Sequence, residues 1–349
     1  MRILIATDAW RPQVNGVVHT LERMSAAARA QGVDIAFLTP EGFATIGLPT
    51  YPEIRLALAA WGTVAKRIER ARADHIHIAT EGPIGLAARR YCQRTRRPFT
   101  TSYHTRFPEY IAARTRIPQS WSYAALRRFH APAAAVMAPT LSIRDDLTRR
   151  GFARVTVWSR GVDHTLFRPR AINAFDLPRP IFLNVGRVAI EKNLEAFLGL
   201  NLPGSKVIVG DGPARASLAA KYPDAHFLGI RAGAALAECY ASADVFVFPS
   251  RTDTFGIVMI EALASGLPVA AFPVPGPLDV IGDSGAGALD DDLTAACLAA
   301  LNISHDQARG HSLRFTWEES ARQFIGNIVA GRGQHSTPEH KNLALSVEC

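Results

Sequence analysis

The sequence is poor in cysteine and lacks the motifs that cysteine builds. Its 349 residues include four scattered cysteines: Cys92, Cys239, Cys297 and Cys349. No Cys-x-x-Cys pair occurs, so neither a disulfide framework nor a structural zinc site is indicated, and a reducing cytoplasm is the expected compartment. His75 and His77 lie two residues apart without nearby carboxylates, which makes them a weak metal site. We therefore expect no metal and no bound cofactor.

Long hydrophobic runs and common nucleotide-binding motifs are also missing. No apolar stretch approaches the roughly 18 residues that a transmembrane helix needs. The first 11 residues hold an apolar run that is too short for a signal-peptide core, so we expect a strand there. Neither a Gly-x-Gly-x-x-Gly fingerprint nor a Walker-type loop occurs, which weakens a dehydrogenase or ATPase assignment. The 48% hydrophobic content is enough for two globular cores.

An acidic pair behind a strand-like run is the most informative feature that is present. The run at residues 245–248 leads to Asp253, and Glu261 follows eight positions later. We expect Asp253 to lie on a loop and bind sugar hydroxyls. We expect Glu261 to lie nearly two turns into a helix, roughly 9 Å from its start, within reach of a ribose diol. An ordinary strand–loop–helix unit with a solvated Asp explains the spacing equally well.

The helix between the two acidic residues is predicted to bind an anion at its N-terminus. It is expected to run from about residue 255 to residue 265, with Thr254 as its N-cap. The first amides of such a helix lack intrahelical partners and can point at a diphosphate. They belong to Phe255, Gly256 and Ile257.

This motif resembles the signature of the family 4 glycosyltransferases, which are retaining nucleotide-sugar enzymes of the two-domain GT-B fold. That signature is Glu-x7-Glu with Phe-Gly inside it, and Asp253 stands where the family usually has Glu. Similar Asp variants occur in branches that resemble bacterial glycolipid synthases. The likeness covers residue 2 to about residue 330. The shorter Asp side chain bears on donor-sugar preference more than on activity.

In the first half of the chain, the resemblance implies two donor-site residues. Gly16, which opens a helix-like segment, is implied to face the donor diphosphate. His104 follows a β-rich run at residues 98–101, and open α/β sheets build their sites at the carboxyl ends of strands. It is implied to contact the transferred sugar. From the residues alone, a turn glycine and a packed histidine are ordinary alternatives.

In the second half, the resemblance implies two cations and a glycine turn. Arg187 and Lys192 are implied to bind the diphosphate, because fixed cations stabilise the charge that develops on the leaving oxygen. A surface ion pair with Glu191 is the alternative from the residues alone. A strand-like run then ends in a turn that is implied to hold the base and ribose: Gly210, Asp211 and Gly212.

The order of strand-like and helix-like segments predicts the fold class. Strands that alternate with helices indicate α/β domains with parallel sheets. The resemblance implies a GT-B fold, with two Rossmann-like, doubly wound parallel-sheet domains that face each other across a cleft. The expected parts are an acceptor-binding domain at 1–165, a nucleotide-sugar-binding domain at 166–314, a helix at 315–330 that crosses back to the first domain, and a disordered tail at 331–349.

Charge is distributed unevenly between the two expected domains. Residues 1–165 contain 24 Arg or Lys and 12 Asp or Glu, a net charge of +12, whereas the remainder has a net charge of −4. A nucleic acid, an anionic membrane surface and simple solvation of the arginines are competing explanations. No helix-turn-helix, zinc-finger or RNA-binding signature occurs, so we expect no nucleic-acid partner.

Two basic-aromatic segments favour the membrane surface. Residues 61–72 resemble an amphipathic helix with an apolar stripe and a basic flank. A second patch between residues 114 and 128 combines arginines with Trp and Tyr. The predicted membrane-contacting residues are Trp61, Lys66, Arg67, Arg70, Trp121, Arg127 and Arg128.

Together, the residues and the resemblance predict a metal-independent retaining glycosyltransferase. Its predicted catalytic residues are His104, Asp253, Arg187 and Lys192. The favoured reaction moves a hexosyl unit from UDP-glucose or UDP-glucuronate to a membrane lipid such as diacylglycerol, on the inner face of the cytoplasmic membrane. A GDP-mannose-dependent α-mannosyltransferase acting on a lipid or glycolipid is the first alternative. A non-catalytic sugar-nucleotide or glycan binding protein is the second.

Overall fold

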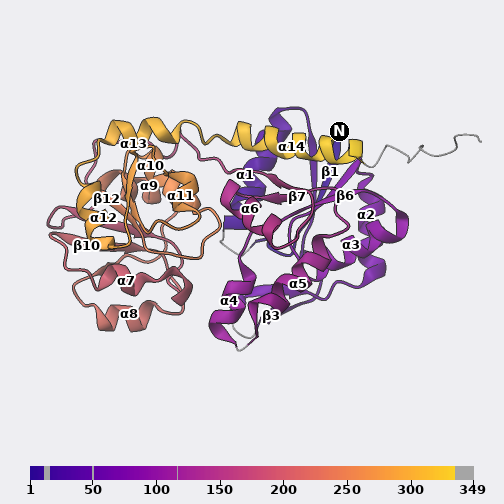
Figure 1. The fold of residues 1–349 in the computed structure, drawn as a ribbon, viewed down its shortest axis with the longest axis horizontal. Coiled ribbons are helices and arrows are strands. Elements are labelled where there is room, and N and C mark those ends of the chain that lie inside the picture. The colour runs from indigo at the N-terminus through magenta and orange to yellow at the C-terminus, as the bar shows by residue number, and fades with distance from the viewer. Residues whose placement is uncertain (12–15, 49–50, 116, 335–349) are drawn as a thin grey trace, which may run out of the picture.

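The computed structural model describes residues 1–11, 16–48, 51–115 and 117–334, which form two lobes side by side (Figure 1). Each lobe is built on a six-stranded sheet in which all paired strands are parallel. The predicted fold class, two doubly wound parallel α/β domains, is therefore confirmed. The family-implied cleft between them stays a prediction, as do the domain limits.

The first domain has the strand order β2-β1-β5-β6-β7-β8. Its strands are β1 (Arg2–Ala6), β2 (Asp34–Leu38), β5 (His75–Ile78), β6 (Phe99–Ser102), β7 (Val136–Ala138) and β8 (Val155–Val157), beside the antiparallel pair β3 (Thr45–Leu48) and β4 (Tyr51–Ala57). Its helices are α1 (Gly16–Ala30), α2 (Trp61–Ala71), α3 (Pro83–Thr95), α4 (Phe107–Arg114), α5 (Gln119–His130) and α6 (Leu141–Arg149).

The second domain has the strand order β11-β10-β9-β12-β13-β14. Its strands are β9 (Ile181–Val185), β10 (Ser205–Val209), β11 (His226–Phe227), β12 (Val245–Phe248), β13 (Val269–Ala271) and β14 (Gly287–Leu289). Its helical segments are η1 (Ile190–Lys192), α7 (Leu194–Leu198), α8 (Arg215–Lys221), α9 (Gly233–Ser242), α10 (Ile257–Ala264), α11 (Pro277–Val280), α12 (Leu293–Ala300) and α13 (His305–Ser312).

The strand order reverses direction beside β1 in the first domain and beside β9 in the second. β1 lies between β2 and β5, and β9 lies between β10 and β12. Open α/β sheets bind ligands outside the carboxyl ends of their strands at such switch points. A ligand site is therefore expected at the loops that follow β1, β9, β10 and β12.

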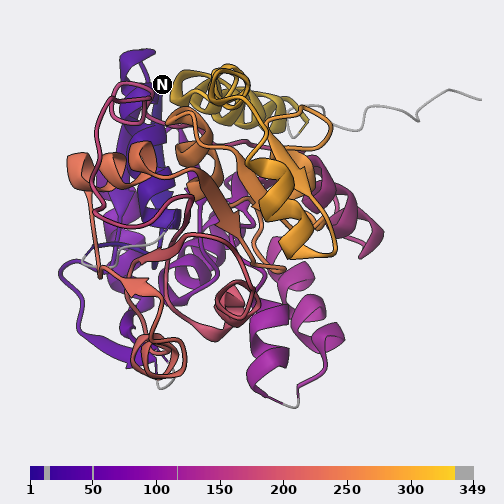
Figure 2. The same ribbon diagram turned by 90° about the vertical axis from the view of Figure 1, so that its left-hand side faces the viewer.

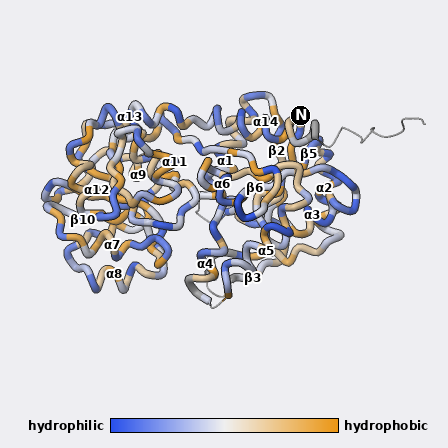
Figure 3. Tube along the Cα trace, in the orientation of Figure 1, coloured by the Kyte–Doolittle hydropathy of each residue, from blue (hydrophilic) through white to orange (hydrophobic). Residues whose placement is uncertain are grey.

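Apolar strands form the centre of each domain, as the hydropathy colouring shows (Figure 3). All four residues of β12 and all five residues of β9 are buried. Helices cover both faces of such sheets, so their strands are apolar on both sides. This explains why residues 245–248 form a continuous Val-Phe run without polar alternation.

Helix α14 (Trp317–Gln334) belongs to the end of the chain but packs on the first domain, where it is the yellow helix along the top of Figure 1. Figure 2 shows it in the same place from the side. Trp317, Phe324 and Ile328 are buried in one cluster with Ile3 and Leu21. The helix continues to residue 334, beyond the expected end at 330. Residues 335–349 of the expected tail lie outside the described residues.

A second contact joins the domains through α6 and α11. The backbone amide and hydroxyl of Ser142 both donate to Asp279 Oδ1, at 3.1 Å and 3.0 Å. Within the described ranges, every helix is too short or too polar to cross a bilayer.

Candidate functional site

Lys192 and Asp253 form an ion pair between the loops that follow β9 and β12. Because these strands are parallel neighbours, both loops leave the same edge of the sheet. Asn193 links the two loops, because its side-chain amide nitrogen donates to the Pro249 carbonyl at 3.0 Å. Lys192 Nζ then donates to Asp253 Oδ1 at 2.6 Å. The sequence prediction had placed these side chains on one ligand without predicting that they pair.

This ion pair leaves one carboxylate oxygen available. Burial, the largest single effect, lowers the pKa of Lys192, but the charge and hydrogen bond of Asp253, together with Tyr110 and Glu191, outweigh it. The pKa of Lys192 is therefore raised and the ammonium stays charged. Asp253 Oδ2 is buried and has no hydrogen-bond partner among the described residues. A buried acceptor without a donor costs free energy. A sugar hydroxyl is a donor of the right kind for this oxygen.

Helix α10 begins two residues later than predicted. Gly256 is its N-cap and has a φ of +82°, a conformation that favours glycine. A Cβ atom on Gly256 would lie 2.8 Å from Met259 Cε and 2.9 Å from Phe248 Cζ. The position therefore requires glycine for both conformation and space. The predicted N-cap, Thr254, does not cap the helix. Its hydroxyl instead donates to the His104 carbonyl at 2.8 Å.

Among the described residues, the Thr254–His104 bond and a second contact bring predicted site residues of the two domains together. In the other, a Cβ atom on Gly16 would lie 3.8 Å from Ile257 Cδ1. The first residues of α1 and α10 consequently lie close together. We call the place where Gly16 and His104 meet Thr254 and Ile257 the interdomain junction.

Glu261 lies one turn into α10, roughly 6 Å from its start, and not nearly two turns in as predicted. It is 8% exposed, and its Oε2 accepts a hydrogen bond of 2.9 Å from the Tyr240 hydroxyl. Burial raises the pKa of Glu261 to about 7, against the lowering effects of Tyr240 and of the Arg23 charge. Arg23 belongs to α1, so a charge of the first domain affects the pKa of Glu261 in the second.

Arg187 and the glycine turn follow the neighbouring strands β9 and β10. Arg187 is half-buried at the carboxyl end of β9. A Cβ atom on Gly210 would lie 1.9 Å from the Gly186 carbonyl oxygen, so the two loops touch through their backbones. Asp211 accepts from the Gly212 amide at 2.7 Å and contacts Arg215 at 3.3 Å. Their contacts with a nucleotide stay predictions.

Comparison with known proteins agrees with this geometry. Residues 14–166 match the model described as Glycosyltransferase Family 4, and residues 179–304 match the model described as Glycosyl transferases group 1. The chain is 31% identical to a GDP-mannose-dependent alpha-mannosyltransferase of Mycobacterium tuberculosis, over 97% of this chain and 98% of that protein. The chain belongs to glycosyltransferase family 4.

Two further similarities concern this glycosyltransferase. It is 27% identical to an alpha-monoglucosyldiacylglycerol synthase of Streptococcus pneumoniae, over 93% of this chain and 83% of that protein. Its fold is similar to the structure of sucrose-phosphate synthase from Thermosynechococcus elongatus, with a TM-score of 0.74 and 20% identity, over 96% of this chain and 100% of that chain. The second likeness shows the GT-B fold.

Sequence reasoning missed Tyr110 on α4 of the glycosyltransferase. Its hydroxyl hydrogen bonds with Thr252 of the second domain, near Asp253 and Lys192. Burial and the charge of Asp253 raise the pKa of Tyr110 to about 12. No spacing along the chain relates position 110 to position 252, because this contact exists only when the domains have packed. Tyr240 and Arg160 were missed because their contacts with Glu261 and His104 form by packing within each domain and not through spacing along the chain.

The apolar stripe of α2 packs against the protein core, which changes the membrane prediction. Val64 and Ile68 are fully buried, and Trp61 packs partly buried against the same cluster. An amphipathic helix has the same pattern whether its apolar face meets a core or a bilayer, so the sequence could not decide between them. Lys66 and Arg70 on the other face remain exposed.

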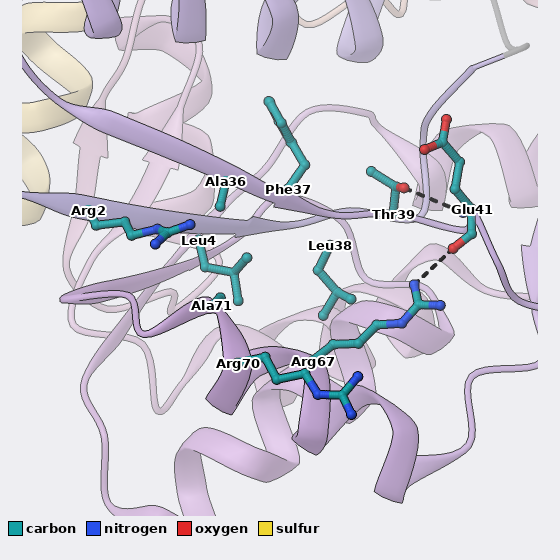
Figure 4. Close-up of a pocket in the computed structure, with 10 residues that line it drawn as sticks. All are labelled: Arg2, Leu4, Ala36, Phe37, Leu38, Thr39, Glu41, Arg67, Arg70 and Ala71. Atoms are coloured by element: carbon teal, nitrogen blue, oxygen red, sulfur yellow. Dashed lines mark hydrogen bonds between the residues drawn. The ribbon is translucent and has the colours of Figure 1, made fainter.

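Arg67 is engaged beside a depression between α2 and the edge strand β2 (Figure 4). It donates to the Glu41 carbonyl at 2.8 Å, and its guanidinium lies 4.1 Å from the centre of the Phe43 ring. None of the residues that line this depression belongs to the interdomain junction. They are Arg2, Leu4, Ala36, Phe37, Leu38, Thr39, Glu41, Arg67, Arg70 and Ala71.

The second predicted membrane patch keeps an exposed aromatic residue. Trp121 at the start of α5 is 71% exposed, and Ile117 just before the helix is 47% exposed. Arg127 and Arg128 on α5 are also exposed, whereas Tyr123 is buried and donates to Glu109. Trp121 is therefore better placed than Trp61 to meet another surface.

The weak metal candidate on β5 has a different role. His77 Nδ1 hydrogen bonds with the Thr100 hydroxyl at 2.9 Å, and His77 Nε2 bonds with the Ser102 hydroxyl at 2.9 Å. His75 Nε2 shares the same Thr100 hydroxyl at 3.0 Å. In the described part of the chain, no three His, Cys, Asp or Glu side chains are grouped to hold a metal ion.

Proposed function

We propose that this glycosyltransferase moves a mannosyl unit from GDP-mannose to a hydroxyl group of a lipid or glycolipid, with retention of the anomeric configuration. The GDP-mannose-dependent relative, which matches over nearly the whole of both chains, supports this donor. UDP-glucose or UDP-glucuronate, with diacylglycerol as acceptor, is the second candidate. The similarity to a glucosyldiacylglycerol synthase supports that alternative.

The observation that carries the proposal is the Lys192–Asp253 pair beside the interdomain junction. An ammonium group has three N–H donors, so Lys192 can keep its bond to Asp253 and still donate to a phosphate oxygen. Arg187 adds a guanidinium that can bind two phosphate oxygens. The amides that begin α1 and α10 complete the anion site from opposite domains.

The remaining groups hold the two sugars of the donor. Glu261 accepts from the ribose hydroxyls. Asp253 Oδ2, which has no partner in the described part of the protein, accepts from a hydroxyl of the transferred sugar. His104 faces the same sugar from the first domain. Donor binding thus makes use of both domains, which favours their closure around it.

These contacts stabilise the transition state through charge and position. As the sugar leaves, negative charge develops on the diphosphate. Arg187, Lys192 and the helix-start amides stabilise this charge in the transition state. The acceptor hydroxyl attacks on the same face as the leaving group, and the departing phosphate accepts its proton. This route retains the configuration without a protein nucleophile or a separate general base.

The acceptor assignment rests on charge and on the relatives. The first domain has a net charge of +12, and Trp121 is exposed on it. Such a surface is attracted to anionic lipid. One relative is named as an alpha-monoglucosyldiacylglycerol synthase, which makes a glycolipid. We place the protein at the cytoplasmic face of the membrane, bound peripherally.

A donor screen with the purified full chain tests the proposal. Radiolabelled GDP-mannose, UDP-glucose and UDP-glucuronate would each be incubated with a membrane lipid extract, and label in the organic phase would be counted. We expect GDP-mannose to label lipid. Asp253→Asn and Glu261→Gln should each reduce the rate by about 100-fold, whereas Asp224→Asn, at an exposed loop position, should not change it.

The other outcomes decide between the alternatives. Label transferred only from a UDP-sugar would replace the donor with the second candidate. Binding of sugar nucleotides without transfer or hydrolysis would show a non-catalytic binding protein.

A further inference from the structure

Arg160 is a buried cation that the reaction described above does not use. It follows β8 and is 4% exposed. No carboxylate among the described residues pairs with it. Instead its guanidinium donates to the carbonyl of Trp158 and lies 4.6 Å from the centre of the Trp158 ring. Burying a charge without a counter-ion is costly.

The other side of the guanidinium contacts the ring of His104. Arg160 Nη2 lies 3.2 Å from His104 Nδ1. A guanidinium group has donors and no acceptor, so His104 Nδ1 must accept with its lone pair. A neutral imidazole with an accepting Nδ1 carries its proton on Nε2. Burial and the charge of Arg160 hold the pKa of His104 well below its usual range, so the ring stays neutral.

The proton-bearing nitrogen of His104 lacks a partner. His104 Nε2 is buried and makes no hydrogen bond with the described residues. The backbone carbonyl of the same residue accepts from Thr254, which belongs to the acidic motif of the second domain. His104 therefore holds a directed, unsatisfied N–H donor at the interdomain junction. An oxygen atom of a bound ligand would satisfy it.

Helix α14 holds the segment that carries Arg160. The Ser159 amide donates to Gln323 Oε1 at 2.9 Å, and the Ser320 hydroxyl donates to the Ser159 carbonyl at 2.8 Å. A Cβ atom on Gly161 would lie 2.4 Å from the Trp317 amide nitrogen, so backbone meets backbone there. The crossing helix thus fixes the segment on both sides of Arg160.

We propose that Arg160 is a positioning residue that fixes the neutral Nε2–H tautomer of His104, so that His104 donates a hydrogen bond to an oxygen of the transferred sugar. This inference rests on the proposed function for the identity of the ligand. The tautomer itself is a property of the protein without any donor bound, and it can be measured separately.

The decisive measurement is the protonation of the His104 ring in the full chain labelled with ¹⁵N-histidine. Long-range ¹H–¹⁵N correlation spectra distinguish an accepting nitrogen from a protonated one, and His104→Gln assigns the signals. We expect the proton on Nε2 from about pH 6 to about pH 8. Arg160→Met should populate the Nδ1–H form, whereas Arg160→Lys should keep the proton on Nε2, because an ammonium also donates.

Activity provides the second readout. Arg160→Met should lower kcat/KM with the true donor by roughly tenfold or more, and Arg160→Lys should restore part of it. The His77 ring, whose two nitrogens bond with Thr100 and Ser102, should be unchanged in both variants and serves as the internal control.

The proposal fails if the wild-type ring carries its proton on Nδ1, or if Arg160→Met leaves the tautomer unchanged. The wild-type spectrum decides this even if Arg160→Met does not fold. A correct tautomer combined with no transfer from any sugar nucleotide would support the positioning role and overturn the proposed function instead.

Discussion

At the scale of single residues, the carboxyl of Glu261 has a pKa well outside its usual range. Its pKa is raised from 4.5 to about 7, chiefly by burial. The folded state therefore favours the protonated form. The resulting contribution to the free energy of unfolding is fully present below pH 4.5 and is lost as the pH rises towards 7. A group that is suited to bind a ligand is here unfavourable for stability near neutral pH.

The first prediction concerns the pH dependence of nucleotide binding. An ionised carboxylate can accept from both ribose hydroxyls, so we expect the affinity for the nucleoside diphosphate to weaken as the pH falls below about 7. Tyr240→Phe removes a hydrogen bond that lowers the pKa of Glu261, and it should move the midpoint to higher pH. Isothermal titration calorimetry with GDP and UDP across this range measures the midpoint.

Tyr91→Phe is the matched control for this prediction, because Tyr91 is also buried but lies in the core of the first domain. It should leave the midpoint where it is. A midpoint that is unaffected by Tyr240→Phe would mean that Glu261 does not control the binding.

At the scale of elements, the start of α10 determines what the acidic motif can contact. Gly256 turns the chain with a positive φ, so the helix begins at Ile257. Thr254 is thereby released from capping and bonds with His104 across the domains. The same turn leaves Asp253 on the loop and Glu261 inside the helix.

The second prediction is that Gly256→Ala lowers the free energy of unfolding by about 1–3 kcal/mol, because the new methyl group meets Met259 and Phe248 in a strained backbone conformation. It should also weaken nucleotide binding. Urea denaturation and calorimetry measure the two effects.

Gly326→Ala in α14 is the contrasting variant. Nothing lies within 4 Å of a Cβ atom at that position, so the substitution should raise the free energy of unfolding by up to about 1 kcal/mol. If both variants lost the same amount of free energy of unfolding, the α10 turn would have no special requirement for glycine.

At the scale of the whole molecule, the two domains differ in charge as well as in position. The net charge is +12 in the first 165 residues and −4 in the rest. An anionic bilayer would attract the first domain and not the second, which would orient the molecule on the surface.

The third prediction is that the protein sediments with vesicles that contain anionic lipid, and that added salt weakens this binding. Replacing both Lys66 and Arg70 with Ser removes two positive charges. This should weaken the free energy of vesicle binding by about 2 kcal/mol, or roughly 30-fold in affinity. Trp121→Ser should weaken binding further. The matched control replaces Arg215 and Lys221 of the second domain with Ser. An equal loss of vesicle affinity in that variant would argue against a bilayer contact through the first domain.

Much of the fold could be predicted because its signals are local. The Val-Phe run at residues 245–248 is apolar on both faces, and it forms the buried strand β12 within the limits that its composition indicates. The resemblance to the glycosyltransferase family assigned Lys192 and Asp253 to one sugar-nucleotide donor before their contact was known. Hydrophobic periodicity and turn chemistry depend on nearby residues.

Where the prediction was incomplete, the missing information was a contact between distant parts of the chain. The stripe on α2 is equally suited to a membrane and to a core, and only the packing of Val64 and Ile68 showed that it belongs to the core. Thr254 had a local role as a cap, but its partner lies 150 residues away in the chain.

The sequence by itself determined the two α/β domains and the acidic motif, because these depend on residue type and short spacing, whereas the diphosphate role of the cations came from the family resemblance. Only the tertiary structure decided how Arg160 holds His104, how Tyr240 holds Glu261 and how Tyr110 reaches the second domain. The physical reason is that these hydrogen bonds join side chains that are far apart in the sequence, so they form only after the elements of each domain, and for Tyr110 the two domains, have packed together.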